Sequence, residues 1–373
     1  IQLAKAGTGP RLPGEPAPAW SAETFDIYGR PVDLPATPAK PQPNDSLQTQ
    51  KAAAQKTAQV RKGVILSAIA TLLLAGHYGL VGVLAEGGRW LGFSVGQIGI
   101  SFVPAVGLLW LRMLVMVPAL ILLATQIHRR TWEDLQDWIY RRDRLLTVLI
   151  GSGIALFFSQ VLLYQSIAQA GPVLGVTLLF LYPLLVVPLK LLTRHWRLSS
   201  LGGVALVAIA MGGFLTIRPT VRPAIGTATP TAIWLGLLAS VAFSLYLVLT
   251  NVSYQQQCHP IPVGIVQFST VAVLSSIVLI VKPLELANIG LFSFALWGIL
   301  LGTVMLLIYL FDYSSLRLGG ASAAAMTAIT PLATVALAWS FSSPDSLEII
   351  QWTGILLLSI GGVALSQEKL SKP

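Results

Sequence analysis

The chain of 373 residues is 54% hydrophobic and only 10% charged, with a mean hydropathy of +0.74 and a net charge of +9. Soluble domains carry roughly 25% charged residues, so this composition excludes an ordinary soluble enzyme or binding module. The excess of apolar side chains indicates a protein whose surface faces lipid.

The first 60 residues differ in kind from the rest. They contain nine prolines but neither a helical pattern nor the apolar core of a signal peptide. We expect a disordered, partly extended cytoplasmic tail over 1–60. The chain begins at Ile1, and whether this is its natural start stays open.

Ten apolar segments follow, each long enough to cross a hydrocarbon core of about 30 Å. They are 63–85, 103–125, 145–168, 172–191, 200–217, 232–254, 262–282, 291–316, 321–341 and 349–366. Gly171-Pro172 and Gly319-Gly320 separate two of the neighbouring pairs and predict hairpins there. The predicted fold class is an all-α membrane protein with ten transmembrane helices.

Basic residues gather in alternate loops, as they do in cytoplasmic loops of membrane proteins. With ten spans, one side carries Lys51, Lys56, Arg61, Lys62, Arg129, Arg130, Arg141, Arg142, Arg144, Lys190, Arg194, Arg197, Arg317, Lys369 and Lys372. The other side carries Arg89, Arg218, Arg222 and Lys282. We therefore expect an integral protein of the plasma (inner) membrane with both termini in the cytoplasm. Anionic lipid headgroups, not nucleic acid, account for the positive charge.

The loop 128–144 predicts a short amphipathic helix on the inner membrane surface. It places Trp132, Leu135 and Ile139 on one helical face, with Trp138 beside them. A plain membrane anchor and a gating element are both open for it.

The glycines and prolines of the apolar segments repeat along the chain. Gly171 stands twelve residues before Pro183, and Gly319 stands twelve residues before Pro331. The chain thus divides into two five-span units, 63–217 and 232–366. Five is odd, so the second unit enters the membrane from the opposite face, and the repeat is inverted. Inverted repeats with broken helices recur in secondary transporters.

The two prolines are predicted to kink their helices and to free backbone carbonyls beside a cavity. Simple tolerance of proline in membrane helices is the alternative. Tyr182, next to Pro183, either lines the cavity or packs in the core.

Two charged residues within the spans need a reason, because charge in a bilayer is costly. Arg112, near the middle of the second span, either binds an anionic substrate group or ties to backbone carbonyls or to Asp312. Asp312 shares a helical face with Tyr309 and is a candidate for the coupling proton, or is simply hydrated near the span's end. Tyr309 is a cavity candidate.

Three further residues complete the candidates. His77 either relays protons or is a neutral, hydrogen-bonded histidine. Gln160 and Tyr164, at i and i+4 of the third span, either line a substrate cavity or make interhelical hydrogen bonds. We expect no catalytic residues, metal or cofactor. The single cysteine, Cys258, excludes an intramolecular disulfide.

These features together resemble the EamA domains of the drug/metabolite transporter superfamily. The resemblance rests on the arginine in "GLLWLRMLVMVPAL", the hairpins "AQAGPVLGVTLLFLYPLL" and "LGGASAAAMTAITPLA", and the closing glycine-rich spans. It covers about 63–367. It implies ten helices in inverted five-helix repeats and alternating-access transport of small solutes, often efflux. The chain lacks the family's Gly-Glu pair after each proline-bearing span.

The leading interpretation is a secondary active exporter of a small metabolite, with proton coupling as an option. The alternatives are a non-transporting receptor or scaffold and, less favoured, a membrane-embedded transferase. The loops contain no Asp-rich motif, HExxH or Walker motif, which argues against an enzyme and against direct ATP drive. One arginine, one carboxylate and several tyrosines suit an amino acid or related metabolite as substrate. A homodimer stays open.

Overall fold

A computed structural model describes much of the chain, in two compact units that cover Ile1–Pro41 and Gln42–Pro373. The described residues are 24–25, 31–32, 43–86, 88–90, 93–95, 100–140, 144–193, 199–217, 229–284, 291–341 and 347–368. In the first unit, β1 (Thr24–Phe25) and β2 (Pro31–Val32) pair antiparallel, with Thr24 opposite Val32. The rest of the predicted tail up to residue 42 lies outside the described residues.

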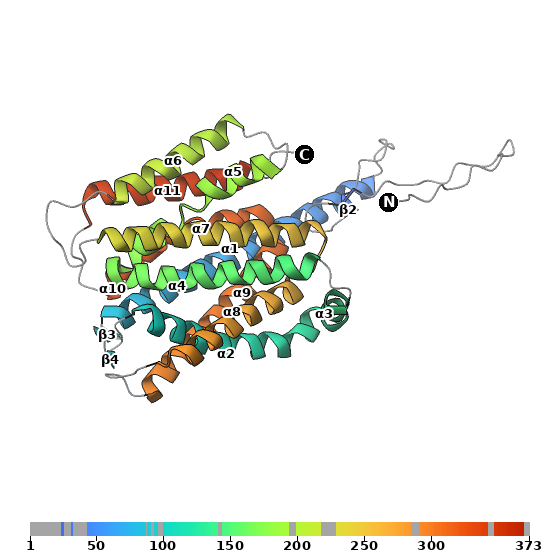
Figure 1. The fold of residues 1–373 in the computed structure, drawn as a ribbon. Helices are drawn as coiled ribbons and strands as arrows, with labels where there is room; N and C mark the ends of the chain where they lie inside the picture. Colours follow the sequence, from blue (N-terminus) through green and yellow to red (C-terminus); the bar gives the residue numbers. More distant parts are fainter. Residues whose placement is uncertain are drawn as a thin grey trace. The chain divides into compact units, whose positions relative to one another are not determined.

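The described residues of the second unit are all-α apart from one small β-hairpin, in agreement with the predicted all-α class (Figure 1). Its helices are α1 (Pro43–Glu86), α2 (Phe102–Ile127), α3 (Thr131–Tyr140), α4 (Arg144–Leu179), α5 (Pro183–Thr193), α6 (Ser200–Ile217), α7 (Pro230–Gln255), α8 (Pro260–Val281), α9 (Leu291–Thr327), α10 (Thr330–Phe341) and α11 (Ile349–Glu368). The hairpin is β3 (Gly88–Trp90) with β4 (Phe93–Val95).

The helix α1 begins earlier than the sequence pattern predicts. Residues 43–60, which we assigned to the disordered tail, are its first turns. Pro43 suits the start of a helix, and the following "SLQTQKAAAQKTAQVR" contains no glycine or proline and many good helix formers. The predicted boundary at residue 60 is therefore wrong for this stretch.

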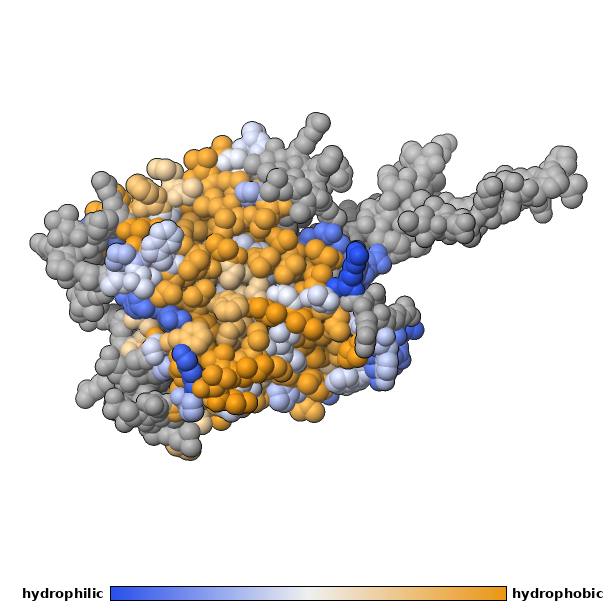
Figure 2. All heavy atoms as spheres, viewed as in Figure 1, coloured by the Kyte–Doolittle hydropathy of each residue, from blue (hydrophilic) through white to orange (hydrophobic). Residues whose placement is uncertain are grey.

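Eight helical segments in the described residues are long and apolar enough to cross a membrane. Large apolar side chains lie on their outer faces, and Leu122, Val204, Phe214 and Ile280 are each at least 66% exposed. Figure 2 shows the resulting broad hydrophobic face, with hydrophilic residues toward the ends of the helices. Exposure of an apolar surface of this extent to water would be unfavourable, so the surface indicates contact with membrane lipid.

Two of the long helices contain a turn at a glycine. Gly171 in α4 has φ of +81°, and Gly320 in α9 has φ of +54°, a region that favours glycine. Beyond the first turn, a Cβ placed on Gly175 would lie 3.2 Å from the Ile167 backbone nitrogen. Eight residues of straight helix span about 12 Å, so the chain doubles back here.

The two glycine turns meet α1 at two well-separated points, near its middle and near its C-terminal end. Pro172, next to the first turn, packs against Gly82, whereas Gly319, next to the second, packs against Gly63. Nineteen residues separate Gly63 from Gly82, which is about 28 Å along a helix. That distance is close to the thickness of a hydrocarbon core.

Each chain segment after a glycine turn is broken again just before its proline. α4 ends at Leu179 and α5 begins at Pro183, while α10 begins at the residue before Pro331. Pro183 has no N–H and cannot donate to the carbonyl of Leu179. That carbonyl accepts the Tyr182 backbone N–H at 3.1 Å instead. The carbonyl of Thr327 accepts the Thr330 hydroxyl at 2.6 Å. Each of the two freed carbonyls therefore has one protein donor, and their place beside a cavity stays a prediction.

The bundle is held by pairwise helix packing: α1 lies against α9, α4 against α7, α6 against α11, and α2 against both α8 and α9. Figure 1 shows α6 and α11 running side by side. Their backbones cross closely at two glycines, because a Cβ on Gly212 would lie 2.5 Å from the Gly354 carbonyl oxygen. Small residues at such crossings are typical of membrane helices.

The short helix predicted within 128–144 is confirmed as α3. Its buried residues include Leu135 and Trp138, whereas Trp132 and Ile139 are exposed. Leu135 and Trp138 thus pack against the protein, and the contact of Trp132 and Ile139 with the membrane surface stays a prediction. Figure 1 shows α3 at the end of the unit where α1 begins, and β3–β4 at the opposite end.

Replacement of Gly212 by alanine should lower the free energy of unfolding by about 1–3 kcal/mol, because the new methyl group meets the Gly354 backbone. The matched control is Gly151→Ala, where the nearest atom would be a Leu249 methyl carbon at 3.6 Å. Both sites are helix interiors, so the gain in helix propensity is shared. Chemical or thermal unfolding in detergent measures the difference, and equal stability of the two variants would contradict the close crossing.

Candidate functional site

The structure gathers four of the predicted site residues into one buried polar cluster: Arg112 from α2, His77 from α1, and Gln160 and Tyr164 from α4. Each side chain is at most 4% exposed. Arg112 lies about 15 Å along α2 from its first residue, which is half of a hydrocarbon core. We call these four residues the Arg112 cluster.

One nitrogen of the guanidinium makes the cluster's main contacts. Arg112 Nη1 donates to Gln160 Oε1 at 3.1 Å and to the Tyr164 hydroxyl oxygen at 2.7 Å. These two bonds use both of its hydrogens, so its 3.5 Å approach to His77 Nε2 is not a third bond.

The contacts around His77 favour one tautomer. The Tyr164 hydroxyl accepts from Arg112 and lies 3.0 Å from His77 Nε2, which also lies 3.5 Å from the cationic Arg112 Nη1. A bare lone pair on Nε2 suits both neighbours better than a proton does, so we assign the imidazole proton to Nδ1 and let the Tyr164 hydroxyl donate to Nε2. The chain Arg112–Tyr164–His77 links three helices.

Two N–H donors of the cluster are buried without a partner: Arg112 Nε and His77 Nδ1. All hydrogen-bond partners of Arg112 are neutral, and the ring of Tyr164 lies 5.7 Å from the guanidinium carbon. The predicted tie between Arg112 and Asp312 is absent. Arg112 is thus a buried cation whose described contacts include no carboxylate.

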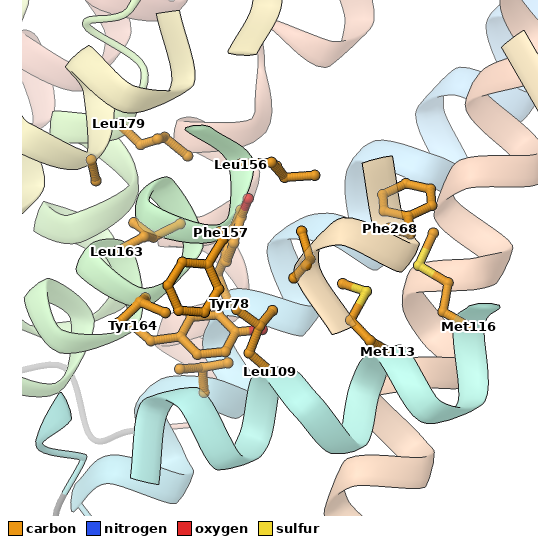
Figure 3. Close-up of a cluster of buried hydrophobic side chains, with 14 of the residues drawn as sticks. Tyr78, Leu109, Met113, Met116, Leu156, Phe157, Leu163, Tyr164, Leu179 and Phe268 are labelled. Carbon is orange, nitrogen blue, oxygen red and sulfur yellow. The ribbon is translucent and has the colours of Figure 1, made fainter. Parts of the chain in front are cut away.

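Apolar side chains surround the cluster. Figure 3 shows Tyr78, Leu109 and Phe157 gathered about the ring of Tyr164, with Met113 and Met116 further along α2. The rings of His77 and Tyr78 meet edge to face at 5.6 Å. Such a dry shell strengthens each polar contact inside it and raises the cost of each unmade one.

Tyr182 and Pro183 line a separate small pocket of about 60 Å³. The other lining residues come from α5, α9, α11 and the turns before α5 and α10: Phe180, Val186, Val187, Ala324, Ala328, Leu358, Gly362, Leu365 and Ser366. The pocket thus lies where the two broken segments approach each other. Pro331 is not among its lining residues.

Tyr309 and Asp312 do not join Arg112. The Tyr309 hydroxyl donates to the carbonyl of Pro260 at 2.9 Å, at the start of α8, and its ring meets Phe268 edge to face. Asp312 is half-buried one turn further along α9. These two residues lie toward the end of the bundle that carries α3.

Sequence reasoning missed a second polar cluster at this end, formed by His128, Asp134, His259 and Tyr313. His128 Nε2 lies 2.9 Å from Asp134 Oδ2, and the rings of His128 and His259 stack at 4.0 Å. Tyr313 OH lies 3.2 Å from His259 Nε2. Only the fold brings these residues together, so no spacing in the sequence signals them.

His259 caps the first turn of α8 with a neutral ring. Its Nδ1 accepts the Ile261 backbone N–H at 3.3 Å, and a proton there would break the cap. Burial, with a further contribution from the neighbouring His128, lowers the pKa of His259 to about 4.

The chain has distant similarity to known proteins. No family model matches the chain. A protein of Synechocystis sp. described as an uncharacterized transporter is 27% identical over 320 residues, which cover 83% of this chain and 94% of that protein. A crystal structure at 16% identity gives a TM-score of 0.48 over 83% of this chain and 99% of its own. The chain is a distant homologue of the Synechocystis protein and an integral, multi-pass membrane protein.

The low pKa of His259 predicts a loss of stability in acid. In the unfolded chain His259 has an ordinary histidine pKa near 6.5, whereas in the folded protein it is protonated only near pH 4. Between these two pH values the unfolded chain binds more protons than the folded protein. Stability from this group is complete above pH 6.5 and falls as the pH drops from 6.5 to 4. His259→Asn, which keeps a capping side chain, should show a smaller fall in melting temperature over that range. An unchanged pH slope in the variant would contradict this role of His259.

Proposed function

We propose that this protein is a secondary transporter of the EamA type, which moves a small metabolite across the membrane by alternating access. Its ten spans form two inverted five-helix repeats, with α4–α5 and α9–α10 each supplying two spans. The Arg112 cluster is the central substrate site. The observation that carries the proposal is a buried cation, paired only with neutral groups, halfway through a bundle with a lipid-compatible surface.

The packing of the helices supports the repeat. If the first unit (α1, α2, α4–α5, α6) is exchanged with the second (α7, α8, α9–α10, α11), the most extensive packing pairs exchange with it, whereas the smaller pairs α1–α4, α2–α4 and α4–α10 have no counterpart of similar extent. The pair α1–α9 becomes α7–α4, and α2–α9 becomes α8–α4. The pair α5–α6 becomes α10–α11, and α6–α11 becomes itself. A pseudo-two-fold axis between inverted repeats produces this set of pairs.

The positions of the glycine turns also support inversion. The turn at Gly171 lies near Gly82 of α1, and the turn at Gly320 lies near Gly63, about 28 Å away along the helix. Equivalent hairpins at opposite membrane faces are what an inverted repeat requires. The 27% identity to a protein described as a transporter adds independent support for transport over catalysis.

In this proposal the end of the bundle with α3 and the basic start of α1 faces the cytoplasm of a plasma (inner) membrane, and the direction is export. Tyr182 and Pro183 belong to the pathway where the broken segments meet, and Pro331 kinks its counterpart. Asp312, half-buried toward the cytoplasmic end, and His77, in the central cluster, are the candidates for proton coupling. Tyr309 packs beside the start of α8 on the cytoplasmic side.

Transport itself is tested by flux into proteoliposomes, with labelled amino acids, monocarboxylates, nucleosides, sugars and organic cations as a panel. We expect saturable uptake of one class by the wild type. Gln160→Leu should lower that flux at least ~10-fold, because it removes a charge-assisted acceptor of Arg112.

The matched control is Gln165→Leu, one turn further along α4. Gln165 bonds only to the carbonyl of Val161 within its own helix and lies outside the cluster. Its flux should stay within about two-fold of the wild type. No flux of any class through well-folded protein, or equal losses in both variants, would refute the proposal.

The orientation is tested with the native cysteine and an impermeant maleimide. Cys258 lies between α7 and α8, next to His259, and is partly exposed. In cells that express the protein, it should react only after permeabilisation. In a Cys258→Ser background, Thr231→Cys at the opposite end of α7 should react in intact cells. The reverse pattern would invert the proposed topology.

A further inference from the structure

The unused donors of the Arg112 cluster point to the chemistry of its ligand. We infer that the cluster binds the carboxylate of a small monocarboxylate that carries no second charge. This inference rests on the proposed function and names the substrate class of its central site.

The geometry leaves one edge of the guanidinium free. Among the described residues, the side-chain hydrogen bonds of Arg112 all run from Nη1, and Nε is buried without a partner. A carboxylate bound to Nε–H and Nη2–H makes two parallel bonds, the arrangement in which arginine recognises this group best. Tyr164 and Gln160 hold Nη1, so the free edge is fixed in position before a ligand arrives.

His77 offers a second unused donor in the same cluster. With Nε2 engaged by Tyr164, its proton lies on Nδ1, which is also buried without a partner. An unmade hydrogen bond of a buried donor costs about 1–3 kcal/mol, and more beside a charge. Both orphaned groups are donors, so the missing partner is an acceptor.

The charge of the cluster selects a monoanion. Arg112 supplies one positive charge, and the groups that touch it are a neutral imidazole, an amide and a phenol. A bound carboxylate brings the net charge of cluster and ligand to zero, whereas a phosphate dianion would leave a net negative charge in an apolar shell.

The same count disfavours amino acids, the substrate class suggested from the sequence. An ammonium group would need its own acceptor, and Asp312, the carboxylate expected for that role, lies with Tyr309 toward the other cluster. Leu109 and Phe157 are instead apolar neighbours of Tyr164, and Tyr78 adds an aromatic ring with an uncharged hydroxyl (Figure 3). The remainder of the ligand that meets this shell is therefore uncharged.

Three compounds with one carbon skeleton test the inference: 3-methylbutanoate, 3-methylbutanamide and valine. Each is titrated against the melting temperature of the purified full-length protein in detergent, at constant ionic strength and pH 7.5. Binding raises the melting temperature in proportion to saturation. The acid should act at concentrations at least ~10-fold lower than the amide or valine. The amide cannot form the charge-assisted pair with Arg112, and valine buries an ammonium group that has no acceptor.

Variants of the cluster locate the binding. Arg112→Gln should remove the response to the acid. If that variant does not fold, His77 supplies a second test, because Asn places an N–H where Nδ1 stands and Leu does not. His77→Leu should weaken the response at least ~10-fold, and His77→Asn should stay within about three-fold of the wild type.

Four results would overturn the inference. Three concern the acid: an equal response to acid and amide, a response to the acid that survives Arg112→Gln, and no response to the acid although another solute is transported. In the last case the proposed transport function stands while the ligand class falls. An Arg112-dependent response to the acid without flux of any solute would leave the ligand class standing and refute transport. Nitrate, a planar inorganic monoanion, is run in parallel, and an equal effect of nitrate would also refute a site for carboxylates.

Discussion

The burial of a guanidinium halfway through an apolar bundle is the constraint on which the structure depends most. Insertion scales put the cost of such a charge at about 2.5–3.5 kcal/mol or more. Neutral side chains from two other helices offset this cost by hydrogen bonding. The hydrogen bonds among Arg112, Tyr164 and His77 therefore connect α2, α4 and α1 at one depth. The arrangement positions the cation firmly and leaves part of it unsatisfied, which is what a binding site needs and a purely structural tie does not.

Backbone hydrogen bonding in lipid imposes the second constraint. A break in a membrane helix leaves backbone carbonyls without their helical hydrogen bonds. In lipid such a break is stable where other groups of the protein donate hydrogen bonds to those carbonyls. The breaks before Pro183 and Pro331 obey this rule through a turn N–H and a threonine hydroxyl. Ser67 and Thr71 of α1 likewise donate to the carbonyls of Ala323 and Met326 between the second glycine turn and its proline. The broken segments are therefore held without being locked into straight helices, which suits a part that moves during transport.

The sequence predicts the helices well and the site only in part, for a physical reason. Hydropathy and length identify spans because a bilayer demands about 20 apolar residues, and Gly171 and Gly320 mark turns because their backbone requires glycine. Which side chains meet depends on the rotation of each helix about its axis. In a soluble bundle the polar face reveals that rotation, but here the lipid-facing side is apolar too. The alternative that ties Arg112 to Asp312 therefore rests on chemistry alone, and the stacking of His128 on His259 has no signal in the sequence.

The most direct test of the account is a distance between ligand and protein. Solid-state NMR of the protein in lipid, with ¹⁵N-labelled arginine and 3-methylbutanoate labelled with ¹³C at the carboxyl carbon, reports whether the two groups touch. The account predicts a strong dipolar contact, consistent with N–H···O distances of about 2.7–2.9 Å, that disappears in Arg112→Lys. The absence of the contact at saturating ligand, or its persistence in that variant, would contradict the claim that Arg112 holds the substrate.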